Sequence, residues 1–311
     1  MFCIVAFVVL SILGIFSATN RALARESLDC VFRRVTFRPC NTGFDEKVKA
    51  RILGSVITRS ETAARVLNKN FELLSWIFFF LLLASSVWSV RGLYLFYTTG
   101  SCNGLNASGF CVFDPAGNNN QVSASVGCAA KPPTESDVNL KDVDLTGMAK
   151  LDQGSKDEIM MIGCYHCDYT RKAYPMIRDM VSHYKVNFVF FNYPTKETND
   201  YFTRLSYCVN QQAPEKFWEF NDIMFSGDKS RLDDATYMNK MLEDLGLSMD
   251  TLTFCTGDPL TESTVQKQMR EIEGSNFYGT PTVFIHSKAF VGPKPYRVYA
   301  IALEGLLFWL K

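Results

Sequence analysis

The segment Ile159-Met160-Met161-Ile162-Gly163-Cys164-Tyr165-His166-Cys167 decides the fold, because a run of apolar residues leads directly into two cysteines at CxxC spacing. A short, uninterrupted apolar run is typical of a buried strand. After the motif, apolar residues recur at helical spacing: Tyr169, Ala173, Met176, Ile177 and Met180. We therefore expect a strand followed by a helix, with the cysteine pair on the first turn of that helix.

This position predicts unusual thiol chemistry. Unpaired amides and the positive end of the helix dipole favour a thiolate over a thiol. We expect Cys164, the first and more exposed cysteine, to have a lowered pKa, and His166 to add to this stabilisation when it is charged or hydrogen-bonded. A disulfide that releases a well-stabilised thiolate is an oxidant.

The same spacing also suits one half of a zinc site, so a metal-handling protein is an alternative. The sequence has no second CxxC, and its three histidines, His166, His183 and His286, do not lie at ligand spacing from one another. We therefore expect no metal at the cysteine pair.

A second motif lies far downstream, where Gly279-Thr280-Pro281-Thr282-Val283-Phe284-Ile285 places a proline at the start of a β-rich run. Cis peptide bonds are almost confined to proline, and a cis bond here would present a backbone edge to a bound peptide. The alternative is an ordinary trans proline in a turn.

From about Val143 to the C-terminus, the chain resembles the DsbA-like branch of the thioredoxin superfamily. The resemblance rests on the order of elements: a strand, the cysteine motif at a helix start, a strand over Asn187–Tyr193, a helical insertion over about 196–275, the proline motif and a closing helix. It implies an α/β, thioredoxin-like fold over residues 138–311. Helical patterns in this part of the chain cover Tyr201–Gln211, Glu215–Phe225, Asp233–Leu245, Asp258–Ile272 and Tyr296–Leu310.

The resemblance also implies roles for individual residues. Cys164 would be the nucleophile, Cys167 the resolving cysteine, and His166 the residue that tunes them. Pro281 would be the cis-proline facing the disulfide, and the candidate substrate contacts are Thr280, Pro281 and Tyr165. Glu158 occupies a position where relatives carry a buried acid that helps proton transfer; the alternative is a solvated charge at the start of a strand.

Two stretches are apolar enough to enter a membrane, and we expect transmembrane helices over residues 1–18 and 71–98. The second has no charge from Leu73 to Val90, and its aromatic residues suit the two membrane interfaces. The first is short enough to be an interfacial or signal-like segment instead.

The distribution of charge predicts the orientation of these spans. Residues 18–70 contain eleven basic and five acidic residues, whereas residues 98–150 contain three basic and five acidic ones. The positive-inside rule then makes residues 19–70 a partly helical cytoplasmic loop, with the N-terminus and the catalytic domain extracytoplasmic. We interpret the basic loop as a surface that faces lipid headgroups rather than nucleic acid.

The cysteines outside the motif fit this topology. Residues 99–137 form an irregular segment and linker in which Cys102 and Cys111 are close enough in sequence to form a disulfide, leaving Cys128 over. Asn106 begins a glycosylation sequon in that loop. Cys208 and Cys255 in the insertion form a structural bridge or are buried free thiols. Cys30 and Cys40 should be reduced in the cytoplasmic loop, with shared metal binding as the alternative.

These features predict a membrane-anchored, extracytoplasmic thiol–disulfide oxidoreductase without a cofactor. Its substrates would be polypeptides with free thiols or disulfides, and we expect the Cys164/Cys167 pair to oxidise them. Neither predicted span carries a cysteine pair, so re-oxidation would need a quinone-linked membrane oxidase of the DsbB or vitamin K epoxide reductase type. The alternatives are a reductase or isomerase that uses the same residues, and a non-catalytic client-binding subunit of a membrane complex.

Overall fold

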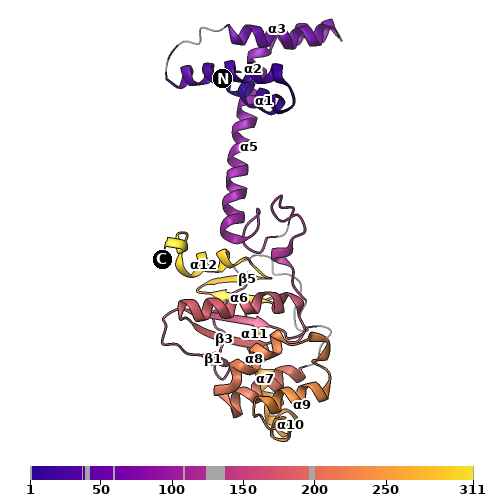
Figure 1. Ribbon diagram of the computed structural model, residues 1–311, viewed down its shortest axis with the longest axis vertical. Helices are drawn as coiled ribbons and strands as arrows, with labels where there is room; N and C mark the ends of the chain where they lie inside the picture. The colour runs from indigo at the N-terminus through magenta and orange to yellow at the C-terminus, as the bar shows by residue number, and fades with distance from the viewer. Residues whose placement is uncertain are drawn as a thin grey trace. The chain divides into compact units, whose positions relative to one another are not determined.

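The computed structural model describes residues 2–36, 38, 43–58, 60–107, 109–123, 137–195 and 200–310. The chain divides into two compact units, Met1–Arg91 and Gly92–Lys311, which are described separately below. Figure 1 shows a mixed sheet with surrounding helices in the carboxyl-terminal unit. The predicted linker at 131–136 and Cys128 lie outside the described residues.

The carboxyl-terminal unit is built on a five-stranded sheet with the strand order β1-β3-β2-β4-β5. Strands β2 and β3 are parallel, and the other neighbouring pairs are antiparallel. Because parallel neighbours require a crossover, helix α6 connects β2 to β3. The strands are β1 (Ala149–Leu151), β2 (Glu158–Gly163), β3 (Asn187–Asn192), β4 (Thr282–Ile285) and β5 (Lys288–Val291). Three were predicted, whereas the short strands β1 and β5 were not.

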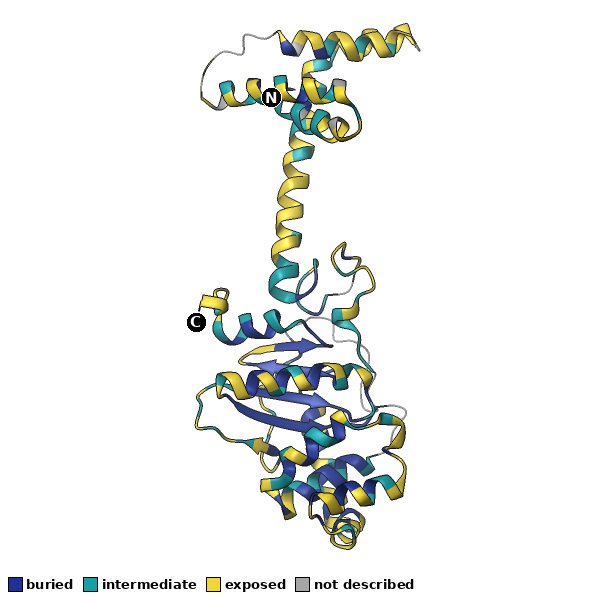
Figure 2. Cartoon of the chain, in the orientation of Figure 1, coloured by how far each residue is buried: buried dark blue, intermediate teal, exposed yellow. Residues whose placement is uncertain are grey.

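Helices cover both faces of this sheet, because successive strand residues point to opposite faces. Ile159 and Met161 of β2 pack in one core cluster with residues of α6, α7, α8, α9 and α12. Met160 and Ile162 pack in a second cluster with residues of α11. Figure 2 shows the strands as the most uniformly buried part of this unit. The apolar run that was predicted to be a buried strand is therefore covered on both sides.

The helical insertion lies between β3 and β4, as predicted, and contains one helix that the sequence did not indicate. That helix is α10, which the Cys208–Cys255 disulfide joins to α7. The helices of this unit are α6 (Asp168–Tyr184), α7 (Tyr201–Gln212), α8 (Phe217–Ser226), α9 (Ala235–Asp244), α10 (Met249–Gly257), α11 (Pro259–Glu273) and α12 (Tyr296–Glu304). Short 3-10 helices cover Asn118–Asn120, Pro214–Lys216, Lys229–Arg231 and Phe308–Leu310.

The described part of the 99–123 segment packs on the domain and is not a free linker. The segment contains the Cys102–Cys111 disulfide. The Asn106 side chain donates to the carbonyl of Ala289 at 2.7 Å and accepts from the amide of Val291 at 2.8 Å. Asn106 is thus 4% exposed and caps the outer edge of β5. This burial contradicts the expectation of an accessible glycosylation site, since its amide nitrogen is already engaged.

The amino-terminal unit is helical, and in the described chain one helix is long and apolar enough to cross a membrane: α5 (Phe71–Thr99). The expectation of two spans is wrong for the first. Helix α1 (Phe2–Phe16) has 15 residues and packs against α2 (Ala18–Val35). At about 1.5 Å per residue it is about 22 Å long, which is less than the roughly 30 Å of a bilayer core.

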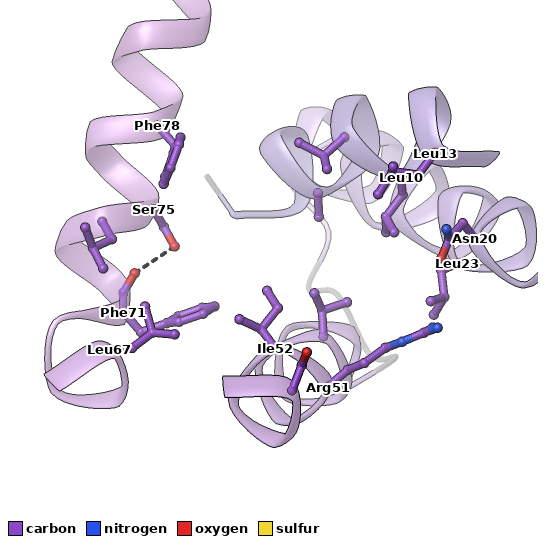
Figure 3. Close-up of a pocket in the computed structure, with 15 residues that line it drawn as sticks. Leu10, Leu13, Asn20, Leu23, Arg51, Ile52, Leu67, Phe71, Ser75 and Phe78 are labelled. Atoms are coloured by element: carbon purple, nitrogen blue, oxygen red, sulfur yellow. Dashed lines mark hydrogen bonds between the residues drawn. The ribbon is translucent and has the colours of Figure 1, made fainter. Parts of the chain in front are cut away.

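The segment 19–70, predicted to be partly helical, contains most of α2 and two further helices. These are α3 (Phe44–Ile57) and α4 (Glu61–Lys69), and Ser60 caps α4 by accepting from the amide of Ala63 at 3.3 Å. The unit contains a cavity of about 440 Å³ with a largely apolar lining, part of which is drawn in Figure 3: Leu10, Leu23, Ile52, Leu67, Phe71 and Phe78.

Cys30 corrects a further expectation. It is buried and disulfide-bonded, not a reduced thiol. Cys40 lies outside the described residues.

Candidate active site

The cysteine pair lies between the end of β2 and the start of α6. Helix α6 begins at Asp168, with Cys167 as its N-cap. A turn precedes the helix, in which the amide of Cys167 donates to the carbonyl of Cys164 at 3.0 Å. The pair therefore sits just before the first helical turn, whereas the sequence predicted it on that turn. Both sulfurs are thiols, not a disulfide.

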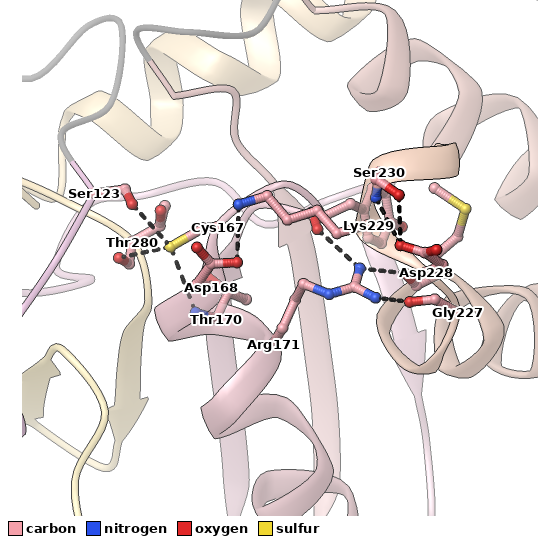
Figure 4. A network of polar contacts seen from close by, with 12 residues as sticks. Ser123, Cys167, Asp168, Thr170, Arg171, Gly227, Asp228, Lys229, Ser230 and Thr280 are labelled. Carbon is pink, nitrogen blue, oxygen red and sulfur yellow. Dashed lines mark hydrogen bonds and ion pairs between the residues drawn. The ribbon is translucent and has the colours of Figure 1, made fainter. Parts of the chain in front are cut away.

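Three groups surround the sulfur of Cys167 (Figure 4). The amide of Thr170 donates to it at 3.4 Å, which is the capping bond of the helix. The hydroxyl oxygen of Ser123 lies 3.2 Å away and the carbonyl oxygen of Thr280 lies 3.4 Å away. A helix N-terminal amide and two oxygen acceptors therefore converge on this sulfur: the amide donates to it, and the thiol can donate to one of the two oxygens.

The proline motif lies beside the cysteines, as the sequence predicted. The Thr280–Pro281 peptide bond is cis. The carbonyl of Pro281 accepts from the amide of Gly292 at 2.8 Å, so the residue after Thr280 is already paired with the end of β5. Thr280 itself is fully buried, and its backbone forms an antiparallel bridge with Ser123.

Exposure of the sulfurs differs from the expectation. Cys164 was predicted to be the more exposed cysteine, but Cys164 and Cys167 are each 2% exposed. The amide of Cys164 donates to the hydroxyl of Thr170 at 3.3 Å, which holds the turn against the helix. In this arrangement an incoming polypeptide does not reach either sulfur without some displacement of the groups around them.

His166 faces the helical insertion. Its Nε2 lies 3.4 Å from a carboxylate oxygen of Asp233, without hydrogen-bond geometry, and its ring packs on Phe202 with the centroids 4.9 Å apart. Burial lowers the pKa of His166, and the Asp233 carboxylate opposes this effect without reversing it. The imidazole is therefore neutral at pH 7, so it does not supply the positive charge that the sequence suggested.

Tyr165 is a core residue, and its expected contact with substrate is contradicted. It is fully buried, and its hydroxyl group lies 2.6 Å from the side-chain oxygen of Asn221 and 3.3 Å from the hydroxyl of Ser206. Burial also raises the pKa of Tyr165, which keeps the phenol neutral. The aromatic rings around it belong to Phe190, Phe202, Phe220 and Phe225.

Glu158 is not an active-site acid. It begins β2, at the opposite end of the strand from Cys164, which places it about 16 Å further along a strand that rises about 3.3 Å per residue. Its carboxylate pairs with Lys150 at 2.7 Å, and its side chain is 34% exposed. The pair forms because β1 and β2 both flank β3, so the structure supports the alternative of a solvated charge.

Two positioning contacts around the motif were not found from the sequence. The guanidinium of Arg171 donates to the carbonyl of Tyr165 at 3.1 Å, to that of Met224 at 2.8 Å, and to that of Gly227 (Figure 4). Lys229 pairs with Asp168 at 2.8 Å. The Arg171 contacts join the cysteine turn to the end of α8, and the Lys229 pair joins the start of α6 to the 3-10 helix that follows α8. No local pattern reveals the contacts with this region, because its residues lie about fifty to sixty positions away.

A family model described as a DSBA-like thioredoxin domain matches residues 120–304. The chain belongs to this family. Members of the DSBA-like family are thiol–disulfide oxidoreductases.

The chain is also similar to solved structures at low sequence identity. The thiol-disulfide exchange protein alpha-DsbA2 from Wolbachia pipientis is 15% identical, with a TM-score of 0.44, over 50% of this chain and 84% of that one. A periplasmic thioredoxin-like protein from Salmonella enterica serovar Typhimurium is 17% identical, with a TM-score of 0.45, over 52% and 90%. Oxidised BdbD from Bacillus subtilis is 19% identical, with a TM-score of 0.41, over 51% and 90%. A search of curated proteins gave no match.

Proposed function

We propose that this DSBA-like protein is a membrane-anchored, extracytoplasmic oxidant of polypeptide thiols, with Cys164 as the nucleophile and Cys167 as the resolving cysteine. The observation that carries the proposal is the convergence of the α6 N-terminus and the Thr280 carbonyl on the sulfur of Cys167. Pro281, the proposed substrate contact, follows that carbonyl directly in the sequence. A polypeptide that pairs with this edge as an added strand would bring its own cysteine close to the motif.

The reaction begins with the Cys164–Cys167 disulfide. A substrate thiolate attacks the sulfur of Cys164, which forms a mixed disulfide and releases Cys167 as a thiolate. A second thiolate of the substrate then attacks the substrate sulfur of that mixed disulfide and releases Cys164. The substrate gains a disulfide and loses two electrons and two protons, and the enzyme becomes a dithiol. The substrate backbone pairs with the Thr280 edge as an added strand.

Stabilisation of the reduced pair supports the oxidising direction. An easily reduced disulfide is one whose dithiol form is stabilised. The Thr170 amide contributes to this by donating to Cys167, and the positive end of the α6 dipole acts on the whole motif. His166 contributes no charge at neutral pH, because burial lowers its pKa.

The direction is measured by the reduction potential of the Cys164/Cys167 couple in the full-length chain in detergent micelles. Equilibration with glutathione buffers, followed by alkylation and mass spectrometry, gives the value. A potential near that of DsbA, about −120 mV, supports the oxidant. A potential near that of thioredoxin, about −270 mV, overturns the oxidising direction in favour of a reductase or isomerase at the same site.

Catalysis is tested by the oxidation of a peptide that carries two cysteines. The oxidised full-length chain should convert this dithiol peptide to its disulfide, and Cys164→Ala or Cys167→Ala should abolish the conversion. Cys3→Ala is the matched control, because Cys3 lies in the amino-terminal unit. No peptide oxidation by the unsubstituted chain would contradict a catalytic role and favour a client-binding subunit.

The anchor in this proposal is helix α5, which places the basic segment and the catalytic domain on opposite sides of the membrane. The positive-inside rule assigns residues 18–70 to the cytoplasm and the domain to the outside. The disulfide at Cys30 argues instead that residues 18–70 lie outside the cytoplasm, because disulfides are rare in the cytoplasm.

Impermeant labelling on intact cells decides between these arguments. A membrane-impermeant lysine reagent should modify Lys156 or Lys288 in the domain and spare Lys47. Labelling of Lys47 together with protection of the domain would overturn the proposed topology. In the proposed cycle, a quinone-linked membrane oxidase re-oxidises the cysteine pair. Such an oxidase should therefore restore the Cys164–Cys167 disulfide of the full-length chain in liposomes.

A further inference from the structure

The backbone edge at Thr280 is already occupied by another segment of the same chain. The amide of Ser123 donates to the carbonyl of Thr280 at 3.0 Å, and the amide of Thr280 donates to the carbonyl of Ser123 at 3.0 Å. These two bonds form an antiparallel bridge, as an added strand would. The residues Gln121–Ser123, called the bridging segment below, therefore use both backbone groups that Thr280 offers for pairing.

The domain is shaped to accept this segment. A Cβ atom at Gly279 would lie 2.7 Å from the Cβ atom of Val122, and one at Gly292 would lie 2.9 Å from the carbonyl oxygen of Gln121. Real Cβ atoms do not approach other atoms so closely, so the two glycines allow the backbones to meet. Gly292 also has a φ of +84°, which an L side chain rarely adopts.

The residues before the bridging segment fix its position. Lys294 is buried, and its ammonium group donates to the carbonyl of Asn119 at 2.7 Å and to the side chain of Asn120. The side chain of Asn119 donates to the carbonyl of Gly100 at 2.9 Å, and that of Asn120 donates to the carbonyl of Ala107 at 3.1 Å. The bridging segment thus leaves a well-anchored loop and arrives at Thr280 in a defined register.

The segment also reaches the reactive sulfur. The hydroxyl of Ser123 lies 3.2 Å from the sulfur of Cys167, on the side where Thr280 also approaches it (Figure 4). Because successive side chains of an extended segment point in opposite directions, Ser123 faces the sulfur while Val122 packs on Gly279. A substrate residue that is paired with Thr280 would have the position that Ser123 now holds.

We propose that the bridging segment is a built-in substrate mimic, which competes with polypeptide substrates for the Thr280 edge and so regulates access to the cysteine pair. The proposal rests on the proposed function, because it names the regulation of that same site. It accounts for the occupied edge and agrees with the burial of both sulfurs. A substrate strand must displace Ser123 from Thr280 before it can pair there.

Tethering makes this competition strong. The bridging segment is held near Thr280 by the anchored residues Asn119 and Asn120, so its pairing is intramolecular, and intramolecular binding of this kind has an effective concentration of about millimolar. Extended peptides that pair only through their backbone at low concentration do not displace it. Unfolded polypeptides whose side chains also contact the domain displace it. The segment therefore favours clients that make such contacts in addition to the two backbone hydrogen bonds with Thr280.

Kinetics of the full-length chain test the competition. Ser123→Pro removes the amide that donates to Thr280, and Ser123→Ala keeps both backbone bonds while removing the hydroxyl. One hydrogen bond contributes about 1 kcal/mol, so we expect the KM for a dithiol peptide to be about fivefold lower for Ser123→Pro than for Ser123→Ala. Equal KM values for the two variants would overturn the proposal.

Cross-linking tests the position of the segment without any client. In a Cys164→Ala background, Ser123→Cys should form a disulfide with Cys167 under mild oxidation, located by mass spectrometry of a non-reducing digest. Val122→Cys is the matched control, because the side chain of Val122 packs on Gly279. No cross-link from position 123, or equal yields from both positions, would overturn the proposal.

The two assays separate failure of this inference from failure of the proposed function. If the unsubstituted chain oxidises peptides but position 123 does not cross-link to Cys167, the substrate mimic is wrong and the oxidoreductase stands. If position 123 cross-links but neither the unsubstituted chain nor Ser123→Pro oxidises a peptide, the bridging segment is in place and the proposed function is wrong. Because the cross-link needs no catalysis, it remains informative if Ser123→Pro does not fold.

Discussion

The sulfur of Cys167 lies 3.4 Å from the carbonyl oxygen of Thr280, although 113 positions separate the two residues in the sequence. This contact forms because β2, which leads into the cysteine motif, pairs directly with β4, which follows Pro281. The central strands of the sheet therefore bring a helix N-terminus and the backbone edge at Thr280 to the same sulfur. The further contact with Ser123 shows that this edge is filled by the chain itself.

Removal of the Tyr165 hydroxyl should affect stability and not substrate affinity. Tyr165→Phe leaves Asn221 and Ser206 without their shared buried partner, and the loss of such a hydrogen bond costs about 1–3 kcal/mol. We expect a corresponding decrease in the free energy of unfolding, measured by denaturation of the full-length chain in micelles, with an unchanged KM for peptide. A raised KM at unchanged stability would restore Tyr165 as a substrate contact.

Glu158 should be dispensable for catalysis. Its ion pair with Lys150 is partly exposed, and such pairs contribute about 0–1 kcal/mol to stability. Glu158→Gln should therefore leave the rate of peptide oxidation and its pH profile unchanged, in an assay from pH 5 to pH 8. A change in the pH profile would mean that this carboxyl group takes part in proton transfer after all.

The pH dependence of stability should report the environment of His166. Because burial lowers its pKa in the folded state from the ordinary value of 6.5, the unfolded chain binds the proton more readily. The stability of the fold with a neutral His166 is therefore fully present above pH 6.5, and it is lost as the pH falls through 6.5 towards the lowered pKa of the folded state. As the pH falls from 8 to 5, the free energy of unfolding of the full-length chain should decrease less for His166→Gln than for the unsubstituted protein, as measured by denaturation. Identical pH slopes for the two proteins would contradict this prediction.

Asp233 provides a separate test of the same site. Its carboxylate raises the pKa of His166 against the effect of burial, so Asp233→Asn should lower that pKa further. The measurement is an NMR titration of the three histidines, of which only the signal of His166 should shift. An unchanged titration of His166 would show that the carboxylate lies farther away than 3.4 Å in solution.

The Cys102–Cys111 and Cys208–Cys255 disulfides should differ in their contribution to stability. The Cys208–Cys255 bridge closes a loop with a sequence separation of 47, and the Cys102–Cys111 bridge one of 9. Loop-closure entropy then predicts losses of about 4 and about 2.5 kcal/mol when each bridge is removed by a pair of Cys→Ala substitutions. Denaturation of the two double variants measures both losses, and a larger loss for the shorter loop would contradict the estimate.

The sequence predicted those parts of the fold that have a local pattern. The apolar run Ile159–Ile162, the helix after the motif and most of the insertion helices carry clear periodicity, and a proline that opens a strand limits where the peptide-binding edge can lie. Short elements were missed: β1 and β5 have three and four residues, too few for a recognisable period. The first predicted membrane span was not confirmed: its apolar run is short in the sequence, and α1 ends after 15 residues.

The active site was predicted only where its residues lie within the two motifs. The contacts of Ser123, Arg171 and Asp233 depend on chain segments that meet through the fold, and nothing in their neighbouring residues indicates them. Tyr165 and Glu158 were misplaced for the same reason, since position relative to a cysteine does not tell whether a side chain enters the core or the solvent. Tertiary packing decided each of these cases.

The central claim is that Cys164 exchanges disulfides with a polypeptide and that Cys167 resolves the product. The most direct test incubates the reduced Cys167→Ala chain with a peptide that carries a disulfide and identifies the modified cysteine by mass spectrometry. We predict a stable mixed disulfide at Cys164, with release of the other half of the peptide as a thiol, and none in Cys164→Ala. An adduct that is absent, or that forms equally in Cys164→Ala, would contradict the account.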